Sequence, residues 1–230
     1  MMIMPSDKWN NIRYRVPSWF SLERARRVQK MLAARVIEED KLPNKIRLVG
    51  GVDISYKGDK AYGVAVLLDF PSLTVVEYAV SSVKVKFPYV PTLLAFREIG
   101  PIIAAIKRLS RLPDVLFVDG QGRAHPYRLG LACHLGVVLD IPTIGVAKKK
   151  LCGRLGEFKN DWAPLIDDNE VIGAAVVTMK GHKPVYVSIG HKVSLKTAIE
   201  LTLKCCKGHR LPEPTHIAHV IATKARRMGL

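Results

Sequence analysis

The chain is long enough for one substantial hydrophobic core, and it is strongly basic. It has 230 residues, of which 48% are hydrophobic and 24% charged, with a formal net charge of +16. This composition excludes a disordered or fibrous protein, and the length allows one domain or at most two. The excess of lysine and arginine favours a polyanionic partner over a surface that is merely well solvated, because neutralising phosphates releases counterions.

Neither the cysteines nor the N-terminus indicates export or a membrane. The four cysteines show no zinc-ligand spacing and no convincing disulfide framework, so we expect reduced thiols. The N-terminal segment lacks the apolar core of a signal peptide, and no apolar run approaches the ~20 residues that cross a bilayer. These features predict a cytoplasmic protein with no membrane partner.

A leading helix is expected over residues 21–41, after an N-terminal extension of residues 1–20. Ser21 can cap this helix, because its side-chain oxygen can accept a hydrogen bond from the first turn. One stripe of the helix is apolar, and the opposite face is cationic and expected to be solvated. The apolar stripe is Ala25, Val28, Leu32 and Val36, and the cationic face carries Arg24, Arg26, Arg27 and Lys30.

Three strands are expected next, over residues 46–56, 61–70 and 73–85. The first alternates in the way of a strand. Turn residues at 57–60 and 71–72 separate the three. The core is therefore predicted to begin as an antiparallel meander.

Helices and strands alternate in the second half of the chain. Helices separating strands are typical of parallel pairing, so we predict an α/β fold with a mixed central sheet, an antiparallel meander followed by parallel strands, flanked by helices. The whole chain, residues 1–230, is predicted to form one domain. The elements are a helix at 93–112 kinked or interrupted at Gly100-Pro101, a strand at 115–118, a helix at 127–139, a strand at 143–147, a hairpin of 171–179 and 185–189, and helices at 194–207 and 214–227.

Three carboxylates stand at positions suited to chemistry. Asp119 follows the apolar strand 115–118, and Asp53 lies among apolar neighbours in the first strand, where an unpaired acid is costly. Glu98 lies on the helix that follows the third strand. If the first and fourth strands are neighbours, the two aspartates meet near the middle of the sheet. Clustered carboxylates favour Mg²⁺ or Mn²⁺, although each acid alone is explained equally well by a salt bridge or a helix cap.

Seven motifs follow one another along the chain. They are Gly51-Val-Asp53-Ile-Ser-Tyr56, Pro88-Tyr-Val-Pro91, Leu94-Ala-Phe-Arg97-Glu98, Asp119-Gly-Gln-Gly-Arg-Ala-His125-Pro126, Ile141-Pro-Thr-Ile-Gly-Val-Ala-Lys148, Gly190-His191 and Arg210-Leu-Pro-Glu-Pro-Thr215. In this order they resemble the motifs of the endonuclease V family, and the resemblance covers the chain from about Arg24 to its C-terminus. The resemblance implies an RNase H-like fold and a DNA-repair endonuclease dependent on Mg²⁺, for which Mn²⁺ can substitute. It also implies recognition of deaminated bases, chiefly inosine, and hydrolysis of the second phosphodiester bond on the 3′ side, giving 3′-hydroxyl and 5′-phosphate ends.

The resemblance also implies the catalytic residues. Asp53, Glu98 and Asp119 match the acidic positions that bind metal and catalyse hydrolysis, and Lys148 is expected to act at the phosphate or the catalytic centre. A fourth catalytic position, Asp in many members, is His219 in this chain. A neutral imidazole can bind water, phosphate or a metal through nitrogen, but it adds no negative charge to hold Mg²⁺.

Recognition residues follow from the same motifs. Tyr89, between Pro88 and Pro91, matches a strand-separating wedge; extruding a base costs a few kcal/mol and is cheapest for a badly paired one. The base pocket is implied to contain Leu94, Gly120, Gly122, His125 and Lys148, with glycine backbone close to the base edge. His125, like Lys148, is expected to contact phosphate or the catalytic centre.

Two other functions fit parts of the sequence. A non-cleaving module that binds inosine or nucleic acid would need the basic charge but not three acids. A structure-selective nuclease of the RNase H fold would need the acids but not the Tyr89 wedge. The expected partner is DNA containing deoxyinosine, with inosine-containing RNA left open, and we expect a monomer with no obligate protein partner.

Overall fold

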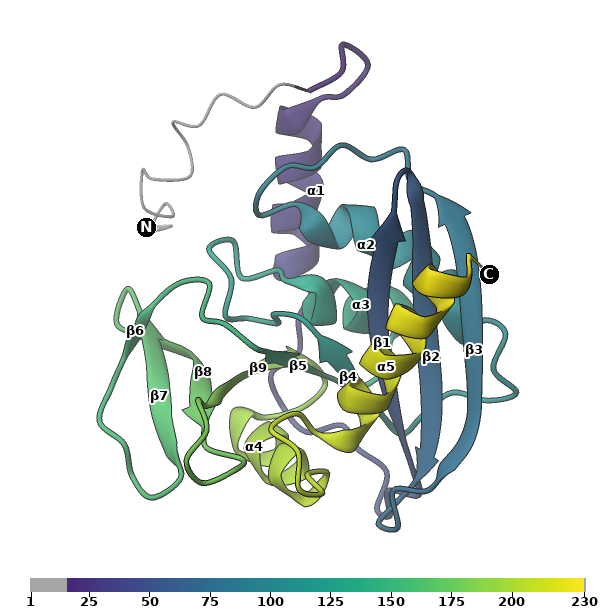
Figure 1. The fold of residues 1–230 in the computed structure, drawn as a ribbon. Helices are drawn as coiled ribbons and strands as arrows, with labels where there is room; N and C mark the ends of the chain where they lie inside the picture. Colours follow the sequence, from purple (N-terminus) through teal and green to yellow (C-terminus); the bar gives the residue numbers. More distant parts are fainter. Residues whose placement is uncertain (1–15, 230) are drawn as a thin grey trace.

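The computed structural model describes residues 16–229, which form a nine-stranded mixed sheet with helices on both faces (Figure 1). The strand order is β3-β2-β1-β4-β5-β9-β8-β7-β6. β1 pairs with β4 and β4 with β5 in parallel, and the other pairs are antiparallel. The strands are β1 Leu48–Lys57, β2 Lys60–Asp69, β3 Val75–Lys84, β4 Val115–Asp119, β5 Thr143–Ala147, β6 Arg154–Leu155, β7 Trp162–Asp167, β8 Glu170–Val176 and β9 Val185–His191.

Two hydrophobic cores lie on opposite faces of this sheet. Helices α2 and α3 cover one face, and α4 and α5 cover the other; in Figure 1, α5 crosses in front of β1 and β2. None of the helices in residues 16–229 is long and apolar enough to cross a membrane. The helices are α1 Leu22–Ala33, α2 Leu94–Ile106, α3 Leu131–Leu139, α4 Leu195–Lys204 and α5 Glu213–Met228.

The predicted α/β fold with a mixed sheet is confirmed, and the predicted meander is β1, β2 and β3. The late hairpin is β8 and β9. The prediction missed β6 and β7, which extend the antiparallel side of the sheet. Pro164 inside β7 weakens the strand pattern there. The single-domain assignment of residues 1–230 stays a prediction, and most of the extension predicted at 1–20 lies outside the described residues.

The leading helix is shorter than predicted. Ser21 caps α1 as expected, but the helix ends at Ala33 instead of residue 41. Beyond it the chain runs beside the end of β9, where the Ile37 carbonyl accepts from the Lys192 amide and the Lys41 amide donates to the Lys192 carbonyl. These backbone bonds replace the helical ones. The stripe was also partly wrong, because Val28 is exposed.

Two later helices also differ from their predicted spans. Helix α2 continues through Pro101 without interruption and ends at Ile106, short of residue 112. The Pro101 carbonyl accepts a hydrogen bond from Ser81 on β3, so tertiary contacts hold the helix on the sheet. Helix α3 begins at Leu131 instead of residue 127, because the preceding residues form turns.

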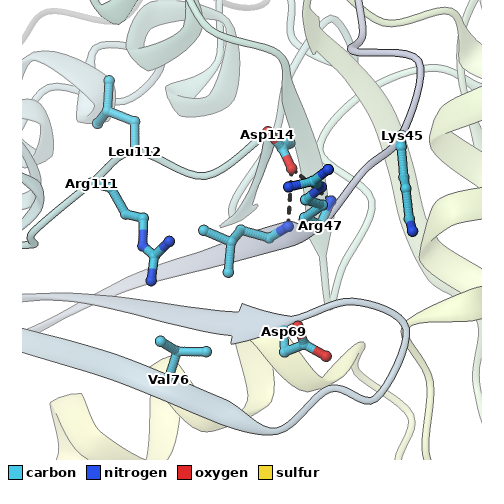
Figure 2. Close-up of a pocket in the computed structure, with 8 residues that line it drawn as sticks. Lys45, Arg47, Asp69, Val76, Arg111, Leu112 and Asp114 are labelled. Carbon is cyan, nitrogen blue, oxygen red and sulfur yellow. Dashed lines mark hydrogen bonds between the residues drawn. The ribbon is translucent and has the colours of Figure 1, made fainter.

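A cavity of about 640 Å³ lies where β1 and β4 begin (Figure 2). Asp114, just before β4, accepts hydrogen bonds from the backbone amides of Arg47 and Leu48 at 2.7 and 3.0 Å. These bonds, dashed in Figure 2, anchor the loop before β4 to the start of β1. The acid at this end of the two strands is therefore structural, and the predicted catalytic acids lie toward their other end.

Candidate active site

Asp53 and Asp119 are brought together by the parallel pairing of β1 and β4. The register joins Val52 to Val118, so the two aspartates follow on adjacent strands. The condition stated from the sequence, that the first and fourth strands are neighbours, is therefore met. Both carboxylates are largely removed from solvent, with side-chain exposures of 9% for Asp53 and 13% for Asp119.

Helix α5 places His219 beside these acids. A Cβ atom on Gly51 would lie 1.9 Å from the Pro214 carbonyl oxygen, so only glycine allows α5 to approach β1 this closely. Further along α5, His219 Nδ1 lies 2.7 Å from Asp53 Oδ2. The ring nitrogen can donate to that carboxylate oxygen and orient it.

One potential ligand atom from each of Asp53, Asp119 and His219 lies within 4.8 Å of the others. Two carboxylates and an imidazole form a donor set that fits a divalent cation. Carboxylate oxygens suit Mg²⁺ and Mn²⁺, whereas imidazole nitrogen is a common ligand of transition metals. His219, for which the sequence left a contact with water, phosphate or metal open, therefore joins the cluster. Glu98, predicted as a metal ligand, lies beside the cluster.

The pKa values of Asp53 and Glu98 are raised by burial and by repulsion between the acids. Burial, and then repulsion from Asp119, raises the pKa of Asp53 to about 6. Burial, and then repulsion from Asp53, raises the pKa of Glu98 to about 8. Acids that repel one another in a desolvated site are stabilised by a cation, so the electrostatics agree with the donor set.

Lys148 supplies part of the compensating charge. It follows β5, and its Nζ lies 2.6 Å from Asp119 Oδ2 and 3.5 Å from His219 Nδ1. About a third of its side chain is exposed, so the ammonium group can also reach a ligand in the cavity. The structure thus brings Lys148 to the acids, and its role in catalysis stays a prediction.

Tyr56 is a neighbour of Glu98 to which the sequence analysis gave no role. Its hydroxyl donates to Glu98 Oε1 over 3.4 Å, and the Arg97 guanidinium lies 5.2 Å from the centre of its ring. Burial and the nearby Glu98 raise the pKa of the Tyr56 hydroxyl. Tyr56 therefore remains protonated and can hold the Glu98 carboxylate in place.

A single cavity of about 830 Å³ connects the acidic cluster with most of the predicted recognition residues. Tyr89, two-thirds exposed, stands at its edge. Pro88 and Gly122 do not line it. The predicted residues that do are Asp53, Tyr89, Pro91, Leu94, Glu98, Asp119, Gly120, His125, Lys148 and His219, and further lining residues include Thr92, Gln121, Leu131, Lys149, Lys150 and Leu151.

Gly122 serves packing, which corrects its predicted place in the pocket. Its amide donates to the Ser188 hydroxyl and its carbonyl accepts from the Gly130 amide. A Cβ there would lie 2.0 Å from the Ile189 carbonyl oxygen. Both of its backbone groups are therefore bonded within the fold. Gly120 and Gln121 line the cavity, and each has one backbone group bonded within the fold, the Gly120 amide to the Val146 carbonyl and the Gln121 carbonyl to the Ala132 amide.

His125 is a buried, neutral residue of the cavity wall. Its Nδ1 accepts from the Tyr127 amide at 3.1 Å, and its ring also bonds to the Thr92 carbonyl. Burial and the nearby Arg26 lower its pKa to about 3. At neutral pH it therefore offers no positive charge to a phosphate, which argues against the phosphate contact expected from the sequence.

The loop that carries Tyr89 is braced by α1, a support that the sequence analysis missed. The fully buried Gln29 donates to the Thr92 carbonyl at 2.7 Å, and Arg26 donates to the Pro91 carbonyl at 3.4 Å. Thr92 has φ +67°, a conformation that costs a side-chain-bearing residue energy. A polar residue on the inward face of α1, Gln29, was the sequence signal for this support. The sequence analysis instead placed Val28 on the buried stripe of the helix.

Comparisons with known proteins agree with one another. A family model described as Endonuclease V matches residues 30–220. The Endonuclease V of Thermofilum pendens is 54% identical over 211 residues, covering 91% of each chain. The crystal structure of the Streptomyces avermitilis Endonuclease V superposes with a TM-score of 0.85 at 40% identity, covering 93% of this chain and 97% of that one.

A further solved structure contains a nucleic acid. It is the Ciona intestinalis Endonuclease V in complex with a 24mer DNA containing an inosine followed by a ribo-adenosine, with a TM-score of 0.80 at 32% identity, covering 89% of this chain and 97% of that one. The match extends over most of both sequence and fold, including the strands and helices that carry the acidic cluster. The chain therefore belongs to the endonuclease V family, with its RNase H-like fold, and is an endonuclease.

Proposed function

We propose that this protein is a Mg²⁺-dependent repair endonuclease that recognises a deaminated base, chiefly inosine, in DNA. It hydrolyses the second phosphodiester bond on the 3′ side of that base and leaves 3′-hydroxyl and 5′-phosphate ends. The observation that carries the proposal is one cavity in which an exposed aromatic residue, Tyr89, faces the same space as the Asp53–Asp119 pair. Base recognition and hydrolysis thereby share one site.

Asp53, Asp119 and His219 would hold the divalent cation, with Glu98 beside them. When bound, the cation supplies Lewis-acid stabilisation of the charge that develops on the phosphate. Lys148 adds a positive charge next to Asp119 and can stabilise a phosphate oxygen or the departing 3′ oxygen. Asp53 keeps the His219 ring oriented.

The other end of the cavity would receive the base. Leu94 and Leu131 provide apolar walls, and the backbone at Gly120 and Gln121 provides polar groups for a base edge. Hypoxanthine presents an acceptor at O6 and a donor at N1, the reverse of adenine, so backbone groups can distinguish the two. Tyr89 can occupy the space left by the extruded base, because an aromatic ring stacks on the remaining bases.

The test is cleavage of matched DNA and RNA oligonucleotides, each with one inosine or one adenosine, in Mg²⁺ with the cut site mapped. We expect cutting of the inosine DNA only when Mg²⁺ is present, at the second bond on the 3′ side. Asp119→Asn should lower the rate by at least about a thousandfold and retain binding. Wild-type protein that binds inosine without cutting would support a binding module, and equal cutting of adenosine oligonucleotides would support a structure-selective nuclease.

We also propose that the protein acts as a monomer in the cytoplasm without an obligate protein partner. The cavity of a single copy already holds the candidate metal ligands together with Lys148 and Tyr89, so the proposed chemistry needs no residue from a second copy. Light scattering with and without inosine DNA measures the assembly directly, and a dimer in both samples would contradict this assignment.

A further inference from the structure

A second cavity, of about 530 Å³, adjoins the first at His219. It shares Asp53, Ile54 and His219 with the first cavity, so the acidic cluster lies where the two cavities meet. The residues that only the second cavity contains are Ser55, Tyr56, Thr223 and Arg226. The site therefore consists of two adjoining cavities. In the function proposed above, the base occupies only the first.

Helix α5 presents polar groups along this second cavity. His219, Thr223 and Arg226 are spaced by four and then three residues, which places them on one face of the helix. From His219 to Arg226 the helix advances on the order of 10 Å, comparable with the rise of about three stacked nucleotides. The face thus follows a strand of nucleic acid away from the acids.

The polar groups of this face are available to a ligand. Within residues 16–229, the side chains of Thr223 and Arg226 make no hydrogen bond or ion pair with the protein. By contrast, the Ser55 hydroxyl already donates to the Ala222 carbonyl at 2.6 Å. A guanidinium group and a hydroxyl group beside a phosphate-cleaving centre suit phosphate oxygens.

The path of the nucleic-acid strand follows from the order of the two cavities. With the base in the first cavity and the cleaved bond on its 3′ side, the strand passes Asp53 and His219 and leaves through the second cavity, which Tyr89 does not line. We propose that the second cavity binds the sugar-phosphate backbone on the 3′ side of the cleaved bond, with Arg226 and Thr223 contacting a phosphate. This inference rests on the proposed function and adds a binding site to it.

The experiment uses single-stranded inosine DNA that ends one, two, three, four or eight nucleotides beyond the cleaved bond. For wild-type protein, kcat/KM should rise with this length and level off after about three or four nucleotides. Arg226→Ala should lose on the order of tenfold in kcat/KM on the longest substrate, through KM, and nothing on the shortest. Its slope of log KM against log salt should fall by about 0.7 on the longest substrate.

Arg227→Ala is the matched control, because it removes a neighbouring charge on α5 that does not line the cavity. In Arg227→Ala, kcat/KM should depend on substrate length as in the wild type. Arg226→Lys should keep most of the rise in kcat/KM with length. Equal losses for Arg226→Ala on all lengths, no loss on the longest, or the same loss in Arg227→Ala would each overturn the inference while leaving the proposed function in place. Wild-type protein that cuts no inosine substrate would overturn both.

Discussion

His219 is the residue at which this chain departs from the acidic pattern of many family members, and it lies inside the cluster of candidate metal ligands. An imidazole contributes no negative charge, so the cluster attracts Mg²⁺ less strongly than three carboxylates would. We expect His219→Asp to lower the Mg²⁺ concentration for half-maximal cleavage several-fold and to reduce any advantage of Mn²⁺. Metal titrations of cleavage, together with calorimetric binding of Mg²⁺ to the free protein, measure both effects.

His216→Asp is the control for this change, because His216 lies on the same helix but lines neither cavity. It adds the same charge nearby and should leave the half-saturating Mg²⁺ concentration within about twofold. An unchanged or higher Mg²⁺ requirement in His219→Asp would show that the imidazole position does not contribute to metal binding.

Gly51 is the residue that lets α5 approach β1, since an added Cβ would collide with the Pro214 carbonyl. We expect Gly51→Ala to lower the free energy of unfolding by about 1–3 kcal/mol and to reduce cleavage, because displacing α5 moves His219 away from Asp53. Urea unfolding and kcat measure the two consequences.

Gly58→Ala is the control for Gly51→Ala, because it lowers stability without displacing α5. Gly58 has φ +61° in the turn between β1 and β2, with open space around it, so alanine there costs about 1 kcal/mol of backbone strain and clashes with nothing. It should lose stability and keep its kcat. Equal losses of kcat in both variants would contradict the positioning role of Gly51.

At the scale of the elements, helix α1 holds the Tyr89 loop in place through the Gln29–Thr92 hydrogen bond. We expect Gln29→Leu to cost about 1–2 kcal/mol of stability, because it removes one of the two donors to the Thr92 carbonyl and the Gln29 acceptor of Arg26. It should also lower the ratio of kcat/KM for inosine over adenosine DNA. Val28→Leu, at an exposed neighbour, should leave both unchanged, and an unaltered ratio in Gln29→Leu would limit α1 to a role in stability.

The elements also show what the sequence could predict. Period-two alternation and turn residues were sufficient for the meander, because β1, β2 and β3 pair with their neighbours in the chain. Tertiary contacts decided the rest. Helix α1 ends where its chain finds backbone partners beside β9, and β7 is a strand despite Pro164 because β6 and β8 flank it.

The candidate site was predictable for a similar reason. Asp53, Asp119 and Lys148 stand at or just after strands, so their adjacency follows from strand order. Gly122 resembled a pocket residue because a glycine turn looks the same whether it faces a ligand or another strand. The placement of His219 depends on how α5 packs across the sheet, and no local pattern contains that information.

At the scale of the whole molecule, two buried histidines link stability to pH. Burial lowers the pKa of His134 to about 4 and that of His125 to about 3, whereas an unfolded histidine titrates near 6.5. Below about pH 6.5 these two histidines bind more protons in the unfolded chain than in the folded one, so the stability they contribute falls as the pH is lowered toward 4. The raised pKa values of Asp53 and Glu98 act in the opposite direction, because the folded chain holds those two protons more tightly.

We expect His134→Leu to remove part of this dependence, on the order of 2–3 kcal/mol between pH 7 and pH 4. Urea unfolding at a series of pH values measures it. His134 Nδ1 is buried and, within residues 16–229, has no hydrogen-bond partner, so leucine should cost little at pH 7. His182→Leu, at an exposed position, should retain the full slope; the same slope in both variants would exclude His134 as a source.

The parallel register of β1 and β4 also limits how the chain can change in length. Successive side chains of a strand point to opposite faces, so inserting or deleting one residue between Val115 and Asp119 would turn the Asp119 carboxylate to the other side of the sheet. The loop before β4 carries no such restriction as long as Asp114 keeps its anchor on the start of β1. Sequences derived from this one should therefore carry insertions and deletions in the loop before β4 and not within β4.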